Sequence, residues 1–422
     1  MHLLRHLLVA VDLLGLAAEV KALTDYSGVE TCPWSQQRPL LSTCVGDGQT
    51  KLNFSGSSSS PGQPQHKFKE DDWGWIGPHK CFQKWCLWSN NQFAGGRGIS
   101  VITLHENMNQ VKAIGVNLNN ANPLDANAFP PPYNIDEVPG KGLGVIANKI
   151  ISRGTQVMTY SPVLLVHKEF IDTPTTQKKR QLLDLAVQVL PENVRTKFEA
   201  QMSSVGSGAH KIAAILITNS FQMSIPTKDG HHYGNFPEVS RLNHNCRPNT
   251  AFHIDENLVH HVNAVQKIKK GEEISISYLD PVAPRDERQK RSLAAWGFSC
   301  DCPACSQHNL LVKLSDERLA EIHELESKLQ SYGSEGITAK MIERLLKLYK
   351  QEKLESRVFG AYTLAALNYN MLGWDRMAVK YAKMAVEEGT IEGGPEAPDV
   401  VAMRVLAGDP RGHFTWRGRV GK

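Results

Sequence analysis

The sequence contains no hydrophobic run of the length that a transmembrane helix requires, which is about 20 residues. It also lacks a long run of lysine or arginine, and its net charge of +4 over 422 residues is too small to indicate a nucleic-acid-binding protein. The composition, with 41% hydrophobic and 21% charged residues, is typical of a soluble globular protein. A chain of this length is expected to form roughly two to three domains.

The first 22 residues have the layout of a secretory signal peptide. Arg5 supplies a weakly basic start, an apolar run extends from Leu7 to Ala18, and Ala22 occupies a small-residue cleavage position. Asp12 interrupts the apolar run, and an amphipathic first helix of the mature protein is the alternative. The sequence therefore predicts a signal peptide over residues 1–22, with a nuclear or cytoplasmic location as the alternative.

The 8 cysteines form two groups. The early group consists of Cys32, Cys44, Cys81 and Cys86, and the later group of Cys246, Cys300, Cys302 and Cys305. An even number of cysteines after a signal peptide predicts two disulfide bonds in the early group, and three pairings are compatible with the sequence. Free thiols in a reducing compartment are the alternative.

Residues 23–130 are rich in turns and include a segment, DDWGWIGPHKCFQKWCLW, whose tryptophans are expected to form a compact core. Gly96–Leu104 and Gln110–Leu118 are predicted as strands that a polar turn separates. A run of prolines at 130–132 marks a boundary, because proline continues neither a helix nor a central strand. We therefore predict a small β-rich region before residue 131.

Residues 131–280 combine short strands with a helical insertion at about 172–224. The strand-like segments are GLGVIANKII, TQVMTYSPVLLV and GEEISISYLD, and the helical ones are TTQKKRQLLDLAVQVLPENVRTKFEAQ and GAHKIAAILITNSF. A hairpin is predicted in AFHIDENLVHHVNAVQKI, with its turn at Asp255–Asn257. The fold class is therefore α+β.

Residues 307–422 are predicted to be almost wholly helical. One face of the first helix carries Leu319, Ile322, Leu325 and Leu329. Ser315 is expected to cap this helix, and a helix pair that turns at Leu372–Trp374 is similar to a tetratricopeptide unit. An ordinary helical bundle is the alternative. The basic tail from Arg411 is expected to be solvated.

The sequence CDCPAC places Cys300, Cys302 and Cys305 too close together to pair easily with one another. Three thiols at this spacing fit a tetrahedral Zn²⁺ site, and Cys246 is the candidate for the fourth ligand. His308 is a candidate substitute ligand, and a set of inert thiols is the alternative.

The sequence GKGLGV, Gly140–Val145, predicts a glycine-rich turn that enters a strand. It does not match a dinucleotide-binding fingerprint, because that fingerprint needs a helix where a strand is predicted here. Taken alone, the turn is either a tight bend or a place where the backbone approaches a ligand.

The order of four motifs resembles SET-domain protein lysine methyltransferases. These motifs are Gly-x-Gly, Asn-His-x-Cys-x-Pro-Asn, GEEISISY and CxCxxC, and the resemblance covers roughly residues 135–306. The helical residues 307–422 are similar to the C-terminal domain of the SET-and-MYND subgroup. The chain departs from that subgroup because no cysteine lies between Gly144 and Cys246, so the MYND zinc finger has no counterpart. A secretory signal also conflicts with a nuclear or cytosolic methyltransferase.

The resemblance implies S-adenosylmethionine as methyl donor, a SET domain at 131–280 and a zinc-binding post-SET segment at 281–306. It implies donor binding by Lys141, Gly142, Ser240, Asn243, His244, Tyr278 and Phe298. It also implies that Tyr278 is the catalytic tyrosine and that Phe221 lines the channel for the substrate lysine. Zinc bound by Cys246 would then hold RLNHN and Phe298 around one donor.

The function expected from the resemblance is protein-lysine N-methylation, with a protein substrate that presents a lysine. Further protein partners are expected to bind the helical residues 307–422. A catalytically silent SET-domain scaffold, secreted or not, is the alternative.

Overall fold

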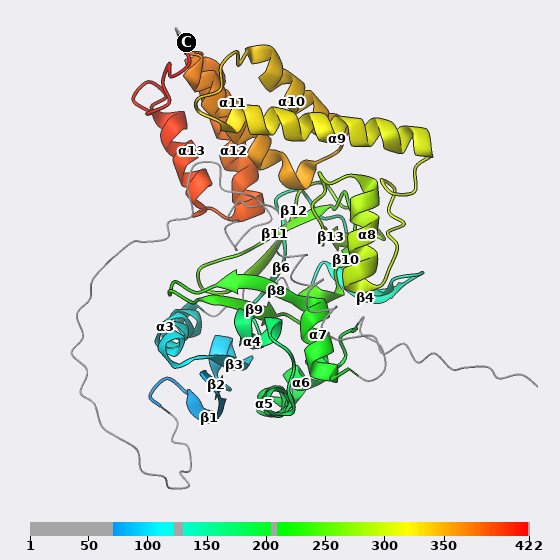
Figure 1. The fold of residues 1–422 in the computed structure, drawn as a ribbon, viewed down its shortest axis with the longest axis vertical. Coiled ribbons are helices and arrows are strands. Elements are labelled where there is room, and N and C mark those ends of the chain that lie inside the picture. The colour runs from blue at the N-terminus through cyan, green and yellow to red at the C-terminus, as the bar shows by residue number, and fades with distance from the viewer. Residues whose placement is uncertain (1–70, 122–129, 204–208, 421–422) are drawn as a thin grey trace, which may run out of the picture.

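The computed structural model describes residues 71–121, 130–203 and 209–420 (Figure 1). The predicted signal peptide, Cys32 and Cys44 lie outside these residues. Strands and short helices form one end of the molecule, and the helices after residue 308 form the other (Figure 1). The predicted α+β fold class is therefore confirmed.

The largest sheet has six strands in the order β1-β2-β3-β7-β9-β8. They are β1 Ile76–Phe82, β2 Trp85–Asn90, β3 Ile99–Leu104, β7 Leu164–His167, β9 His231–Asn235 and β8 Ser220–Ser224. All six side chains of β3 are buried, as expected for a central strand rich in β-branched residues. β3 runs parallel to β7, with Ser100 opposite Leu164. The boundary predicted near residue 130 is thus crossed by one continuous sheet.

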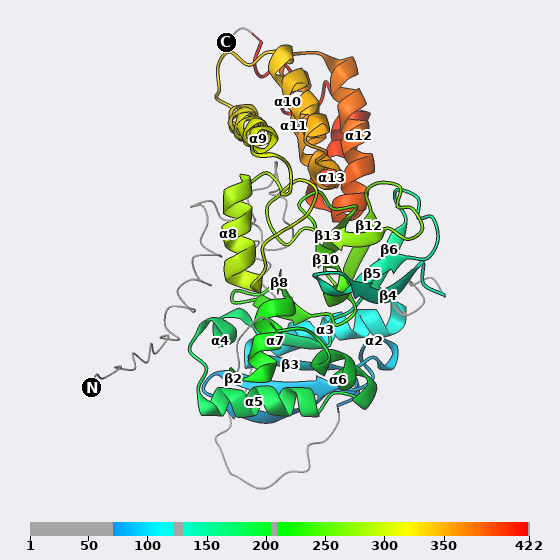
Figure 2. The same cartoon turned by 90° about the vertical axis from the view of Figure 1, so that its right-hand side faces the viewer.

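Helices cover both faces of this sheet, as Figure 2 shows. On one face, Val101 packs in a core that includes α3 (His105–Ala121), and on the other, Ile102 packs in a core that includes α5 (Gln177–Gln188). The other helices of the insertion are α4 Lys168–Asp172, α6 Glu192–Glu199 and α7 Lys211–Asn219. The predicted helical insertion ends in strand β8, so its last five residues are not helical.

The predicted strand Gln110–Leu118 is wrong, because these residues belong to helix α3. Its predicted turn, HENMN, is the first part of the same helix. Met108, Val111 and Ile114 are buried at a spacing of three, which is a helical repeat that packs one face on the sheet. The β-branched residues favoured a strand locally, but burial of this face determined the outcome.

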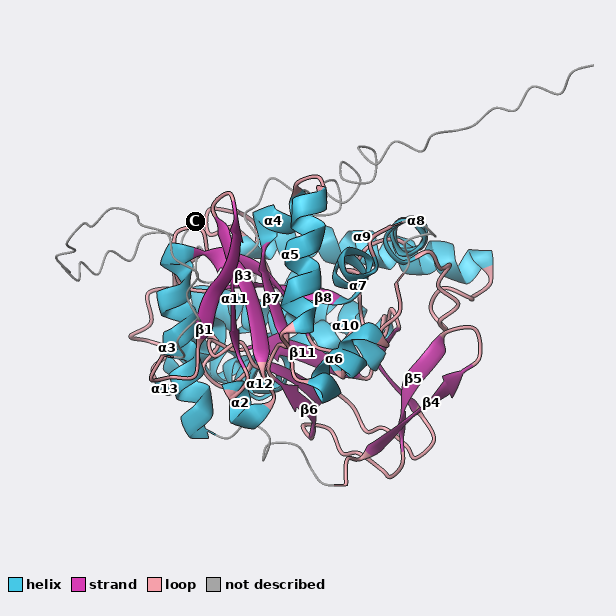
Figure 3. Cartoon of the chain, turned by 90° about the horizontal axis from the view of Figure 1, so that it is seen from below, coloured by secondary structure: helices cyan, strands magenta, loops and turns pink. Residues whose placement is uncertain are grey.

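Two smaller sheets lie between the large sheet and the C-terminal helices. The first has the order β10-β13-β5-β4, made of Asn243–His244, Glu273–Ile276, Gly142–Ala147 and Tyr133–Val138. The second has the order β11-β12-β6, made of Thr250–Ile254, His260–Ala264 and Gln156–Tyr160. Figure 3 shows the β4–β5 hairpin at the margin of the molecule. The hairpin turn predicted at Asp255–Asn257 is present between β11 and β12.

The remaining short elements are α2 Phe93–Gly96 and the 3₁₀ turns Val239–Arg241 and Glu355–Arg357. The later helices are α8 Arg285–Trp296, α9 Asn309–Gln330, α10 Ala339–Gln351, α11 Val358–Met371, α12 Asp375–Gly393 and α13 Pro398–Gly408. Helices α9 to α13 share one hydrophobic core, which includes all four of the apolar residues predicted on α9. None of the helices that the structure describes is long and apolar enough to cross a membrane.

Two expectations for the C-terminal helices need correction. Ser315 does not cap α9, because the helix begins at Asn309 and His308 accepts the capping hydrogen bond. The tail from Arg411 is not simply solvated: the backbone N–H of Arg417 donates to Asn370, and the guanidinium of Arg419 donates to Ser331. The turn predicted at Leu372–Trp374 is present between α11 and α12. The resemblance of that pair to a tetratricopeptide unit stays a prediction.

Candidate functional site

The four later cysteines converge on one buried point. Their sulfur atoms lie within 4.8 Å of one another, and Cys246 Sγ is 3.9 Å from Cys300 Sγ and 3.6 Å from Cys305 Sγ. Four thiolates at about 2.3 Å from a tetrahedral Zn²⁺ lie about 3.8 Å apart, so the cluster fits a structural zinc ion. The predicted substitute His308 instead accepts a hydrogen bond from the Leu310 N–H at the start of α9.

The end of helix α8 positions three of these thiols. Gly297 ends the helix in a left-handed conformation, with φ of 74°, and the chain then turns back along α8. The side-chain amide of Gln289 donates to the Cys300 carbonyl at 2.6 Å and accepts from the Cys300 N–H at 2.9 Å. The turn that carries Cys300, Cys302 and Cys305 is thereby attached to α8.

Arg288 places a buried positive charge beside the sulfur atoms. Its Nη2 atom is 3.8 Å from Cys305 Sγ, and its Nη1 atom donates to the Ala283 carbonyl. Burial by itself would lower the pKa of Arg288, but the negative charge on Cys246 and Cys305 outweighs burial and raises it. Arg288 therefore balances part of the negative charge of the cluster.

His244 connects the thiol cluster to Tyr278. The Nδ1 atom of His244 accepts a hydrogen bond from the Tyr278 N–H at 3.0 Å, so Nε2 carries the proton in the neutral ring. That Nε2 atom lies 3.2 Å from Cys246 Sγ and donates to it. Burial lowers the pKa of His244 to about 4, which keeps the ring neutral. Both nitrogens of His244 are thus used in holding two parts of the site together.

Tyr278 lies among the aromatic rings of His244, Trp296 and Phe298. Its ring centroid is 5.3 Å from that of His244, 5.2 Å from that of Trp296 and 6.4 Å from that of Phe298. Its hydroxyl donates to the Leu242 carbonyl at 2.7 Å. Burial raises the pKa of Tyr278, so the hydroxyl stays protonated and acts as a donor at neutral pH. The predicted residues His244, Tyr278 and Phe298 are therefore neighbours.

The glycine turn is connected to Asn243 through Glu273. The two carboxylate oxygens of Glu273 accept from Lys141 Nζ at 2.8 Å and from Asn243 Nδ2 at 2.9 Å. Gly142 has φ of +75°, which a residue with a side chain rarely adopts. A Cβ atom on Gly144 would lie 2.8 Å from Asn243 Nδ2, so the strand after the turn must pass close to Asn243. The structure thus brings Lys141, Gly142 and Asn243 together.

Two predicted residues lie in other surroundings. Ser240 is in the 3₁₀ turn before Asn243, and its hydroxyl donates to the Pro237 carbonyl at 2.8 Å. Phe221, in β8, belongs to a second aromatic group, in which its ring centroid is 4.6 Å from that of His260 and 5.3 Å from that of Phe252. Their predicted roles in donor and lysine binding stay predictions.

Sequence reasoning missed Glu273, Arg288 and Trp296. Glu273 lies in GEEISISY, and Trp296 is two residues before Phe298, so both stand in motifs already singled out. Arg288 follows no motif, and only an expectation that a thiolate cluster needs a nearby cation would have drawn attention to it.

Comparison with known proteins finds similarity over the residues that form this site. Residues 142–279 match the SET domain, a span that begins in the glycine turn and ends just after Tyr278. The chain is 30% identical over 195 residues to histone-lysine N-methyltransferase set5 of Schizosaccharomyces pombe, which is 45% of this chain and 56% of that protein.

Two further relatives are N-lysine methyltransferases. The chain is 26% identical over 198 residues to SMYD2-A of Xenopus laevis, covering 46% of this chain and 44% of the relative. It is 35% identical over 104 residues to human SMYD2, covering 24% and 23% respectively. The chain thus spans about half or less of the length of these relatives. These matches show that residues 142–279 are similar to a SET domain and that part of the chain is similar to lysine methyltransferases.

Proposed function

We propose that this protein is an S-adenosylmethionine-dependent protein-lysine N-methyltransferase. The match of residues 142–279 to the SET domain supports the reaction type, and the names of the relatives support a lysine acceptor. The observation that carries the proposal is the hydrogen-bonded chain from Cys246 through His244 to Tyr278. It connects the candidate zinc site directly to the candidate catalytic tyrosine.

The donor would be held by the residues around the glycine turn and the Asn243 segment. Lys141 and Gly142 would contact it through backbone groups, while Ser240, Asn243, His244 and Phe298 would surround it. The four thiols Cys246, Cys300, Cys302 and Cys305 would hold Zn²⁺, which has a structural role. S-Adenosylmethionine supplies an electrophilic methyl group on a sulfonium sulfur.

The substrate lysine must arrive as a neutral amine, although a free lysine has a pKa of about 10.4. An apolar channel near Phe221 and the positive sulfonium would both favour the neutral form. The amine nitrogen then forms a bond to the methyl carbon as the carbon–sulfur bond breaks, and the methylated ammonium later releases a proton to water. Tyr278, which stays protonated, would orient the amine, since correct positioning supplies most of the rate in such a displacement.

Zinc-loaded protein tested with tritiated S-adenosylmethionine and pools of lysine peptides provides the test. We expect methyl transfer by the wild type and a loss of about 100-fold or more in Tyr278→Phe, because small misplacements of reactants reduce rates by this factor. Tyr381→Phe, in helix α12, is the matched control and should retain full activity. The absence of donor binding to the wild type by calorimetry would exclude the enzyme and leave a catalytically silent scaffold.

A further inference from the structure

We propose that Glu352, in the C-terminal helical part, is a positioning residue for donor binding, and that it acts through Arg247. This inference rests on the proposed function, because it concerns the same donor site. Arg247 directly follows the thiol ligand Cys246 in the sequence RLNHNCRPN. Glu352 is the C-cap residue of helix α10, 105 residues further along the chain.

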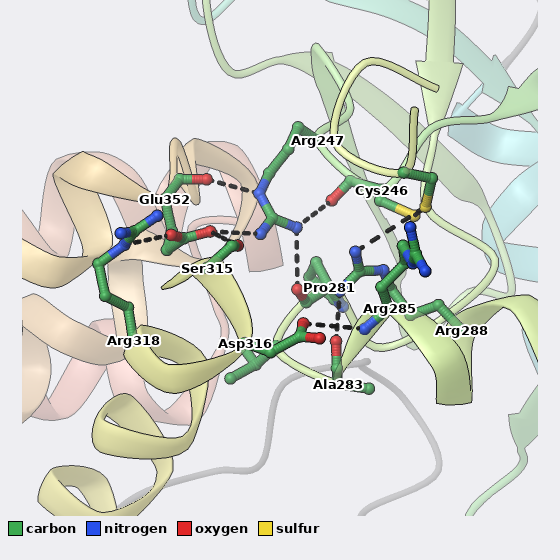
Figure 4. A network of polar contacts seen from close by, with 12 residues as sticks. Cys246, Arg247, Pro281, Ala283, Arg285, Arg288, Ser315, Asp316, Arg318 and Glu352 are labelled. Atoms are coloured by element: carbon green, nitrogen blue, oxygen red, sulfur yellow. Dashed lines mark hydrogen bonds and ion pairs between the residues drawn. The ribbon is translucent and has the colours of Figure 1, made fainter. Parts of the chain in front are cut away.

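The guanidinium of Arg247 joins three segments, as Figure 4 shows. Its Nη1 atom donates to the Cys246 carbonyl at 2.8 Å and to the Pro281 carbonyl at 2.9 Å. Its Nε and Nη2 atoms donate to the carbonyl and the carboxylate of Glu352, at 2.5 Å and 2.9 Å. The planar arrangement of these donors suits several acceptors at fixed directions, which a lysine does not provide.

Glu352 is held firmly in the position that Arg247 needs. Its carboxylate also accepts from Ser315 Oγ and from Arg318 Nε, each at 2.6 Å, and the residue is 6% exposed (Figure 4). Burial would raise the pKa of Glu352, but the hydrogen bonds from Ser315, Arg318 and Arg247 outweigh it and lower the pKa. The carboxylate is therefore charged at neutral pH, and a charged acceptor strengthens each hydrogen bond.

Arg247 connects the two segments that carry the candidate site. Cys246 accepts the hydrogen bond of His244, and Pro281 is three residues after Tyr278. A second residue of the helical part, Arg357, contacts Asp280 at 3.4 Å. The helical part thus contacts both the residue that follows the Asn243–Cys246 segment and the segment after Tyr278. The relative position of these two segments determines the geometry of the proposed donor site.

A second set of ion pairs between the same two parts of the molecule gives a matched comparison. Arg153, before strand β6, pairs with Glu387 and Glu388 of helix α12. This contact also attaches the helical part, but it involves neither the thiol cluster nor the Asn243 segment. If Glu352 only attaches the helices, removing either contact should have the same effect on donor binding.

Calorimetry with S-adenosylmethionine on zinc-loaded, full-length protein tests the inference. We expect the Kd for the donor to rise about fivefold to tenfold in Glu352→Gln and in Arg247→Met, a usual size for coupling between sites. The donor Kd of the double variant should be no higher than that of the more severely affected single variant, because both changes break the same interaction. Arg318→Met, which removes one partner of Glu352, supplies a milder variant with a smaller rise.

The control Glu388→Gln should leave the donor Kd unchanged. The Glu352 and Arg247 variants and this control should all lower the midpoint of thermal unfolding. A donor Kd that is unchanged in the Glu352, Arg247 and Arg318 variants, or that rises equally in Glu388→Gln, would overturn the inference. Wild-type protein that binds no donor would instead refute the proposed function, so the two failures are distinguishable. Zinc content measured on every variant shows whether the rise in donor Kd comes from a loss of the metal. The hydrogen bond from Arg247 to the Cys246 carbonyl predicts that it does.

Discussion

His244 and Cys246 are joined by a hydrogen bond in which Nε2 of the buried imidazole lies 3.2 Å from Sγ of the thiol. The same ring accepts the N–H of Tyr278 on its other nitrogen. A metal held by Cys246 would therefore fix the ring, and the ring would fix the backbone of the candidate catalytic residue. Metal binding and donor binding are expected to depend on each other for this reason.

Replacing Cys246 with serine should remove zinc and weaken donor binding together. We expect about one zinc per wild-type chain, because a structural site takes four protein ligands, and far less in Cys246→Ser. Elemental analysis and calorimetry with S-adenosylmethionine measure the two effects. The Cys81→Ser/Cys86→Ser protein, which lacks the disulfide between β1 and β2, is the control and should keep its zinc. Loss of zinc without any loss of donor affinity would disprove the coupling.

Replacing Arg288 with methionine should weaken zinc binding by about 10-fold to 100-fold, the usual effect of losing a group that contacts a metal ligand. Four thiolates around Zn²⁺ carry a net charge of about −2, and Arg288 is the buried cation 3.8 Å from Cys305 Sγ. Competition with a chromophoric chelator gives the affinity. Arg291→Met, on the same helix but paired with Glu287, should bind zinc like the wild type, and an equal loss in both proteins would argue against a charge effect.

Replacing Glu273 with glutamine should raise the donor Kd by at least about tenfold. The carboxylate holds both Lys141 and Asn243, and loss of a charge-assisted hydrogen bond is worth about 1.5–3 kcal/mol. Calorimetry measures the change, with Glu256→Gln in the exposed β11–β12 turn as control. Unchanged donor affinity in the Glu273 variant would mean that donor binding does not require the hydrogen bonds from Lys141 and Asn243 to this carboxylate.

Replacing His260 with leucine should reduce the sensitivity of the fold to acid. Burial, with smaller electrostatic contributions from the neighbouring His253 and His261, holds the pKa of His260 well below 6.5. The unfolded chain binds a proton at this histidine below about pH 6.5 and the folded chain does not, so the contribution of His260 to stability falls as the pH falls. Between pH 7 and pH 5, the wild type should lose about 2 kcal/mol more unfolding free energy than the variant.

Urea denaturation at the two pH values measures this difference. Other buried histidines contribute to both proteins and cancel in the comparison. Neither ring nitrogen of His260 has a hydrogen-bond partner among the described residues, so the variant should also be no less stable than the wild type at pH 7. If the unfolding free energies of the two proteins instead depend on pH in the same way, His260 binds a proton in the folded state as readily as in the unfolded state.

Local patterns allowed a correct prediction where the deciding contacts are close in sequence. The β11–β12 turn follows from Asp255, whose carboxylate accepts the N–H groups of Asn257 and Val259 at 2.9 Å. The turn between α11 and α12 follows from Gly373, which has φ of +78°. The clustering of Cys300, Cys302 and Cys305 follows from their spacing. In each case a few neighbouring residues supply both the geometry and the hydrogen bonds.

Local patterns failed where a distant surface decided the structure. The segment Gln110–Leu118 has β-branched residues suited to a strand, but it is a helix because one of its faces packs on the large sheet. Ser315 has the chemistry of a helix cap, but its hydroxyl instead donates to the distant Glu352, and α9 starts six residues earlier.

The sequence by itself determined the chemical inventory of this protein: the four thiols of the candidate zinc site, the Asn243–His244 pair, Tyr278 and the order of motifs that resembles SET-domain enzymes. Only the tertiary structure decided which charged side chains contact the residues of the site. Glu273 beside Lys141, Arg288 beside Cys305 and Glu352 beside Arg247 are contacts between different segments. The physical reason is that a buried charge needs a partner of opposite charge, and the fold of the whole chain determines which residue lies within reach.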